Sequence, residues 1–253
     1  MLDLAIPDCY SYLRDRLDTL LGEHDIDLGI LARSDRVWAS DTNDALERQP
    51  IQRWTQLPVP PELVGSHVGP PRSHTTGRVH DPAFRVATAL FRHFGIEWDI
   101  ASASASEQAA LAEAIAFYKR MRPLLHGGQV VRADHPDPAA SLHGVVAADR
   151  AEALFAYVQL TTSAFETPGP ARLPGLHPGG AYRVEPVPVA GEPETKQAVA
   201  PAWPAAGGAT LSGRALGELG LPLPVLQPEQ ALLLHLTARR AADGAWSRPL
   251  DRA

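Results

Sequence analysis

A change of pattern near residue 126 constrains this chain more than any other feature of its sequence. Before that point, apolar runs of strand length alternate with longer stretches in which apolar residues recur at helical spacing. After it, short runs containing Val and Leu follow one another, separated by Pro, Asp and Gly. Alternating strands and helices predict βα units with a parallel sheet, whereas successive short strands predict an antiparallel sheet. We therefore expect an α/β region over residues 1–126 and a small antiparallel β domain over residues 127–253.

The first half contains two N-terminal capping signals for helices. Strand-like runs are expected at residues 36–40, 63–68 and 96–100, and helices at residues 44–54, 82–94 and 104–121. Asp44 and Glu47 have the spacing of a capping pair, and so do Ser104 and Glu107. Pro50 falls inside the first of these helices, so that helix is expected to start late or to kink.

The second half is expected to be mostly strand. Strand-like runs lie at residues 129–133, 142–146, 153–160, 182–187 and 232–236. Residues 185–209 are rich in Pro, Ala and Gly, which predicts a long loop within the β domain.

Three polar residues follow the strand-like run at 36–40, namely Asp41, Asn43 and Asp44. The carboxyl end of a strand in a βα array is where such folds place their active sites. One interpretation makes a carboxylate of this group a general acid/base. The other makes Asp41 or Asn43 the cap of the following helix. Spacing alone leaves both interpretations open.

Three histidines, His67, His74 and His80, alternate with Arg72 and Arg78. They could form a metal or anion site, or simply a polar loop at the rim of the sheet. Their spacing fits none of the usual zinc patterns, and no Cys or close Glu completes a ligand set. We expect no metal and no cofactor.

Another polar group, Glu97, Trp98 and Asp99, follows the strand expected next. An aromatic ring here could stack on a sugar, although a Trp at such a position more often packs against the core.

The charge and cysteine content exclude several classes of function. A net charge of −6 gives no basic footprint for nucleic acid or an anionic membrane surface. No segment approaches the roughly 20 apolar residues that span a bilayer. Cys9 is the only cysteine, so no internal disulfide framework is possible. The opening MLDLAIPDCY lacks the pattern of a secretory signal, and a cytoplasmic location is expected.

A long segment from Asp27 to Gln49, which includes Trp38-Ala39-Ser40-Asp41, is similar to the bacterial α-galactosidases of glycoside hydrolase family 36. The resemblance continues in order through residues 51–54, 65–68, 73–78, 95–99, 119–126, 144–154, 172–176 and 182–184. It implies the C-terminal part of such an enzyme, in which a central (β/α)₈ barrel of the TIM type precedes a β domain. The barrel would be incomplete here.

The resemblance assigns one catalytic residue. Asp41 matches the acid/base of the family's Trp-x-Ser-Asp motif, and Asp44 belongs to the same motif without that role. The family's nucleophile lies in a Lys-Trp-Asp-x-Asn-Arg motif, which this sequence lacks. The Cys/Ser/Gly-rich motif that contacts the sugar is missing too, so no substrate-binding residue is assigned. Residues 4–26 pass directly into residue 27, as though an internal piece had been excised.

These observations predict a retaining glycoside hydrolase that acts on α-galactosides such as melibiose or raffinose. Without the nucleophile segment, this chain alone is expected to be inactive. Two alternatives stay open. One is a non-catalytic module that binds a galactoside or a protein partner. The other is that the missing internal segment reflects a defect in the gene or gene model, so that the functional protein is an intact α-galactosidase. Removing barrel strands leaves open parallel edges, so we also expect a marginal or homo-oligomeric molecule.

Overall fold

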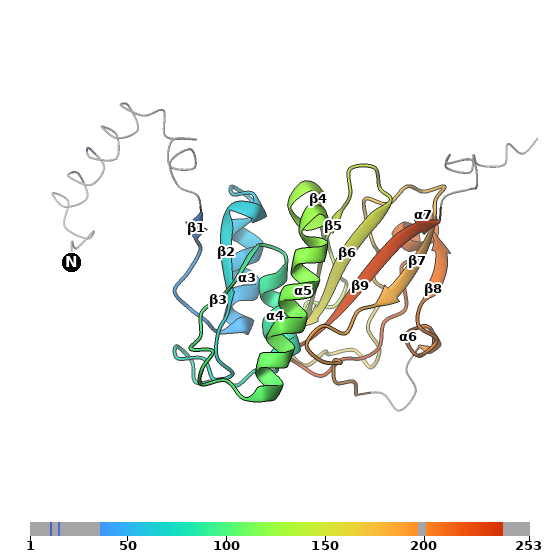
Figure 1. Ribbon diagram of the computed structural model, residues 1–253. Helices are drawn as coiled ribbons and strands as arrows, with labels where there is room; N and C mark the ends of the chain where they lie inside the picture. Colours follow the sequence, from blue (N-terminus) through green and yellow to red (C-terminus); the bar gives the residue numbers. More distant parts are fainter. Residues whose placement is uncertain (1–10, 12–14, 16–35, 197–200, 240–253) are drawn as a thin grey trace, which may run out of the picture.

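The computed structural model describes residues 36–196 and 201–239, together with positions 11 and 15, and contains two β-sheets with helices between them (Figure 1). The first sheet has three parallel strands in the order β1-β2-β3, and the second has six strands in the order β4-β5-β6-β9-β7-β8. All pairings in the second sheet are antiparallel. The predicted combination of a parallel α/β region and an antiparallel β sheet is confirmed.

The parallel sheet is built from three consecutive βα units. Its elements are β1 (Val37–Trp38), α3 (Ala45–Thr55), a 3₁₀ turn η1 (Pro61–Leu63), β2 (Val64–Val68), α4 (Pro82–Leu90), β3 (His93–Ile96) and α5 (Ala105–Gly127). β2 lies in the middle, with Val64 opposite Val37 and Gly65 opposite His93. Within the described residues these strands form an open sheet and not a closed barrel.

Both predicted capping residues, Asp44 and Ser104, are confirmed, but only the second pair is reciprocal. The carboxylate of Asp44 accepts the backbone N–H groups of Leu46 and Glu47 at the start of α3. Ser104 and Glu107 form a reciprocal capping box at the start of α5. The expected late start of α3 is wrong, because the Asp44 cap fixes its beginning and the helix runs on through the exposed Pro50.

The third strand begins earlier than its pattern predicts. α4 ends at Leu90 and β3 covers His93–Ile96, so the helix expected to reach residue 94 and the strand expected at 96–100 are both displaced. Phe94 stacks on Tyr118 of α5, with ring centroids 5.2 Å apart. Gly95 lies inside the strand opposite His67, where an added Cβ would come within 2.5 Å of that ring. The glycine therefore marks a close approach between strands and not a helix end.

The antiparallel sheet contains every strand-like run that the second half predicts. Its strands are β4 (Gln129–Ala133), β5 (Ala140–Val146), β6 (Glu152–Gln159), β7 (Ala181–Pro186), β8 (Ala209–Ser212) and β9 (Gln230–Arg239). The short β8 and the helix α7 (Gly213–Glu218) are not predicted. In the expected loop 185–209, the described residues are irregular apart from the end of β7, the short helix α6 (Ala202–Ala205) and the first residue of β8.

Both faces of the antiparallel sheet are buried, and β6 shows this most clearly. Leu154, Ala156 and Val158 join a core cluster with residues of α4 and α5. The alternate residues Phe155 and Tyr157 join a second cluster on the other face. A strand buried on both faces reads as a continuous apolar run, as the sequence of β6 does. The helices of the βα units thus share a core with the sheet, while the boundary at residues 126 and 127 stays a prediction.

Candidate active site

Polar side chains gather at the carboxyl ends of the three parallel strands. Asp41 follows β1 and Glu97 follows β3, and the Glu97 backbone N–H donates to the Val68 carbonyl at the end of β2, at 3.0 Å. Asp41 is exposed, and it forms no hydrogen bond or ion pair with another described residue. Its position is the one at which βα folds present reactive groups.

Asp44, three residues further on, is fully buried and fully engaged. Its Oδ1 accepts the N–H groups of Leu46 and Glu47 at 2.9 and 3.0 Å. Its Oδ2 accepts a hydrogen bond from Thr76 and another from Arg78, at 3.0 Å. Asp44 therefore caps α3 and holds the loop that follows β2. The interpretation in which Asp41 or Asn43 caps the helix is wrong.

The network around Asp44 reaches the antiparallel sheet through a buried histidine. His80 Nε2 lies 3.3 Å from Oδ1 of Asp44, and its Nδ1 lies 3.0 Å from Oε2 of Glu229, just before β9. Beside it, the Gln230 amide donates to Asp81, the first residue before α4, at 2.8 Å. These contacts join the loop after β2 to the start of β9, an interior strand of the antiparallel sheet.

Thr42 and Asn43 also anchor the loop after β2. The Asn43 side-chain oxygen accepts from the Ser73 hydroxyl at 2.9 Å and from the His74 backbone N–H at 3.2 Å. The Thr42 hydroxyl lies 2.9 Å from that of Thr75. Of the four polar residues from Asp41 to Asp44, only Asp41 has no part in this structural network among the described residues.

A histidine and a tryptophan form an aromatic surface on the same sheet. The His67 ring stacks on Trp38, with centroids 4.3 Å apart and planes 26° apart. Gly65 and Gly95 lie against the His67 ring, which fits because neither has a side chain. Burial lowers the pKa of His67 and the nearby charge of Arg48 adds to this effect, so the ring is neutral at pH 7.

Arg48 links the segment after β1 to the body of β2 and was not singled out by the sequence. Its guanidinium is buried and donates to the Thr42 carbonyl at 2.6 Å and to the Gly65 carbonyl at 3.4 Å. Burial lowers the pKa of Arg48, and the charge of Glu97 opposes that shift. Glu97 thus lies within electrostatic range of both Arg48 and His67. The one sequence signal for Arg48 is its position one turn after the Asp44 cap.

The other candidate residues named from the sequence occupy positions typical of surface loops, turns or the core. His74 is exposed, whereas His80 is buried. The described residues contain no group of three His, Cys, Asp or Glu side chains suited to a metal ion. Trp98 packs against the core with the Arg85 guanidinium 5.3 Å from its ring centre. Asp99 is exposed and accepts the Ala101 N–H in a turn, at 3.1 Å. In the part of the chain described, no helix has the length and apolar character needed to cross a membrane.

Fold and site together define an α/β protein that displays a free carboxylate beside an aromatic surface at the ends of parallel strands. The family model described as Melibiase matches residues 4–128, and the model of the glycosyl hydrolase family 36 C-terminal domain matches residues 140–236. The chain belongs to glycoside hydrolase family 36.

Individual relatives agree with this assignment. An Escherichia coli protein named α-galactosidase is 41% identical over 219 residues, covering 83% of this chain and 30% of the relative. The α-galactosidase AgaA of Geobacillus stearothermophilus is 35% identical over 162 residues, covering 63% of this chain and 22% of the relative. A crystal structure of an AgaA variant in complex with raffinose matches with a TM-score of 0.71 and 28% identity, covering 83% of this chain and 27% of that one. The chain thus spans less than a third of the length of these relatives.

The environment of Asp44 predicts a loss of stability in acid. Burial raises its pKa, but hydrogen bonds from Thr76 and the Glu47 N–H, the charge of His80 and the hydrogen bond from Arg78 outweigh this and hold it at about 2, against 3.8 for an unperturbed group. A lowered pKa stabilises the fold above the unfolded value, and this contribution, about 2 kcal/mol, disappears as the pH falls from 4 towards 2.

Urea unfolding between pH 5 and pH 2 measures this contribution in the wild-type chain and in Asp44→Asn. Asn still caps a helix but cannot carry the charge. The difference between the two chains should shrink as the pH falls through this window. A difference that stays constant would contradict the assignment.

Proposed function

We propose that this chain carries the acid/base half of an α-galactosidase active site, with Asp41 as the group that exchanges protons with the leaving oxygen. The observation that carries the proposal is the contrast between two neighbouring carboxylates. Asp44 is buried and saturated with hydrogen bonds, whereas Asp41 is exposed and unengaged among the described residues. A proton-transfer group must reach substrate and change its charge, and of these two carboxylates only Asp41 is exposed enough to do so.

The chemistry needs a second carboxyl group. Retaining hydrolysis places a nucleophile and an acid/base about 5–5.5 Å apart on opposite sides of the anomeric carbon. The nucleophile forms a glycosyl-enzyme, and the acid/base protonates the leaving oxygen and then activates water. The sequence contains no Lys-Trp-Asp run that would supply the family's nucleophile. We infer that this chain alone does not complete the double displacement.

The proposed substrate is an α-galactoside of the melibiose or raffinose type. Support comes from the relatives, which are named α-galactosidases, and from the AgaA variant, which is in complex with raffinose. The stacked rings of Trp38 and His67 offer an apolar face of the kind that packs against a sugar ring. The two-carboxylate mechanism needs no metal ion.

Hydrolysis of p-nitrophenyl α-galactoside by the purified chain tests the inferred inactivity. We expect no release of nitrophenol above that of a chain carrying Asp41→Asn, because the sequence lacks the motif that carries the family's nucleophile. Activity in the wild-type chain that disappears in Asp41→Asn would mean that another carboxylate acts as nucleophile. Calorimetry with raffinose, run alongside, would reveal a module that binds the sugar without cleaving it.

A graft tests the role of Asp41 directly. Residues 36–239 would replace the matching segment of the Escherichia coli α-galactosidase, which supplies its own nucleophile. In this chimera, Asp41→Asn should lower kcat/KM for raffinose by about 10²–10⁴-fold, the usual contribution of general acid catalysis. The loss should be far smaller for a substrate whose leaving group needs no proton.

Azide provides the diagnostic control, because it attacks a glycosyl-enzyme without help from a base. It should restore turnover of an activated galactoside in the Asp41→Asn chimera and leave the parent chimera unchanged. Asp99→Asn is the matched control, since Asp99 is an exposed carboxylate that follows β3 of the same parallel sheet. Full raffinose activity in the Asp41→Asn chimera would overturn the assignment.

A further inference from the structure

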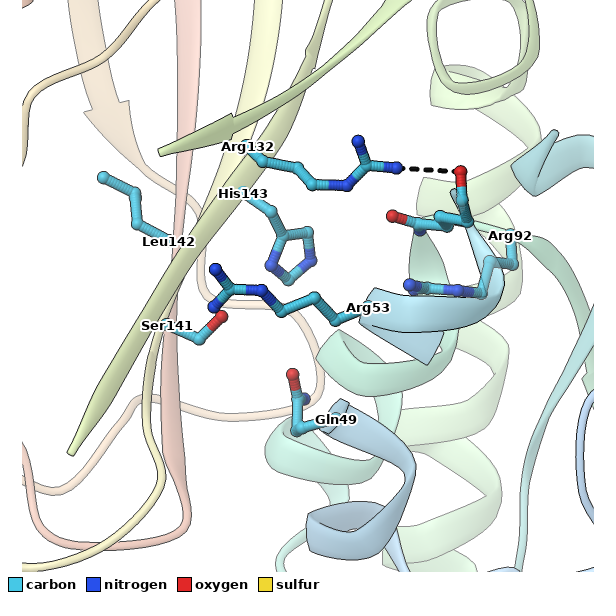
Figure 2. A pocket seen from close by; sticks show the side chains of 8 residues that line it. Gln49, Arg53, Arg92, Arg132, Ser141, Leu142 and His143 are labelled. Carbon is cyan, nitrogen blue, oxygen red and sulfur yellow. Dashed lines mark hydrogen bonds between the residues drawn. The ribbon is translucent and has the colours of Figure 1, made fainter. Parts of the chain in front are cut away.

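A small polar cavity lies between α3 and the antiparallel sheet, away from the carboxyl ends of the parallel strands (Figure 2). It has a volume of about 10 Å³, room for a single particle the size of a water molecule. Its lining consists of Gln49, Arg53, Gln56, Arg92, Arg132, Ser141, Leu142 and His143. Three guanidinium groups and one imidazole therefore surround one small space, and none of the described residues that line it carries a carboxylate.

Arg92 is the buried cation of this group, with only 3% of its surface exposed. Burial lowers the pKa of Arg92 to about 9, and the charges of Arg48 and Arg132 add to the shift, so it remains protonated at pH 7. Its neighbour Gln56 offers a neutral amide oxygen, 3.2 Å from Nε in the orientation that satisfies both groups. A buried charge with only a neutral partner is strongly unfavourable.

Arg53 and Arg132 stand at the exposed side of the cavity. Arg132 donates to the backbone carbonyl of Gln56 at 2.8 Å, which fixes its guanidinium beside the opening. Arg53 lies 3.8 Å from Asp134, whose carboxylate is fully exposed and outside the lining. An exposed pair of this kind contributes little and does not neutralise Arg92. The entrance of the cavity is therefore positively charged through Arg53 and Arg132, and its interior is positively charged through Arg92.

His143 adds a neutral donor to the site. Burial lowers its pKa to about 3, and the charges of Arg92, Arg53 and Arg132 contribute to the shift. A neutral imidazole carries one N–H group, and Ser141 adds a hydroxyl to the same lining. Among the described residues the lining thus combines three cationic groups with neutral donors and contains no carboxylate, which suits an anion and not a cation.

We propose that this cavity binds one monatomic anion, with chloride as the physiological ligand, held by Arg92 from within and by Arg53 and Arg132 at the entrance. Chloride is somewhat larger than a water molecule, so it requires small outward shifts of the exposed Arg53 and Arg132 side chains, whereas a tetrahedral oxyanion such as phosphate or sulfate requires larger ones. A water molecule would fill the space but would leave the charge of Arg92 uncompensated. The site is separate from the proposed galactoside site, and its occupancy would stabilise the packing of α3 on β5.

Chloride NMR tests the proposal on the intact chain in solution. The ³⁵Cl resonance should broaden in the presence of the wild-type chain, and bromide should reverse the broadening while sulfate at equal ionic strength should not. Arg132→Gln should abolish most of the broadening. Arg172→Gln is the matched control, because Arg172 is exposed and lies outside the cavity lining, and it should behave as wild type. Circular dichroism establishes that both variants are folded.

Unfolding in chloride against gluconate at constant ionic strength gives an independent readout that needs no variant. At a chloride concentration ten times the Kd, the ratio of folded to unfolded chain should rise roughly 11-fold. Equal stability in the two salts would overturn the proposal. So would equal broadening in wild type and Arg132→Gln, or competition by sulfate as strong as that by bromide.

Discussion

The buried carboxylate of Asp44 is the interaction on which the rest of the site depends. It caps α3, accepts hydrogen bonds from Thr76 and Arg78, and meets His80 on the path to Glu229. One ionised group therefore fixes the start of α3 and the loop after β2, and it connects through His80 to the start of β9 in the antiparallel sheet. Because these tasks fall to Asp44, the carboxylate of Asp41 is left exposed at the end of β1, where it can serve as an acid/base.

The two sheets cooperate through their shared core and not through a linker. β6 buries alternate side chains on both of its faces, and the face carrying Leu154 packs with α4 and α5. The Arg92 cavity lies in the same contact zone, where α3 meets β5. The antiparallel sheet is thus a support for the βα units, and its packing helps to hold the strand ends that carry Asp41 and Glu97.

Local signals in the sequence predicted local structure well. The pair Asp44 and Glu47 predicted the start of α3, and the run at residues 129–133 matches β4. Features that depend on distant contacts were missed, because no local pattern encodes them. Gly95 reads as a helix end until its contact with His67 is known, and Arg48 is recognised only from the two carbonyl groups it joins. Spacing left capping and catalysis open for Asp41, and only the resemblance favoured catalysis, which stays a prediction.

The central claim is that two carboxylates three residues apart have separate tasks, one structural and one chemical. Urea unfolding of Asp41→Asn and Asp44→Asn at pH 7 tests it most directly. The account predicts that Asp44→Asn lowers the free energy of unfolding by about 2 kcal/mol, because it removes a buried charge with engaged partners. Asp41→Asn should change that free energy by less than about 0.5 kcal/mol, as exposed and unengaged positions do. Equal losses in the two variants, or a larger loss in Asp41→Asn, would contradict the account.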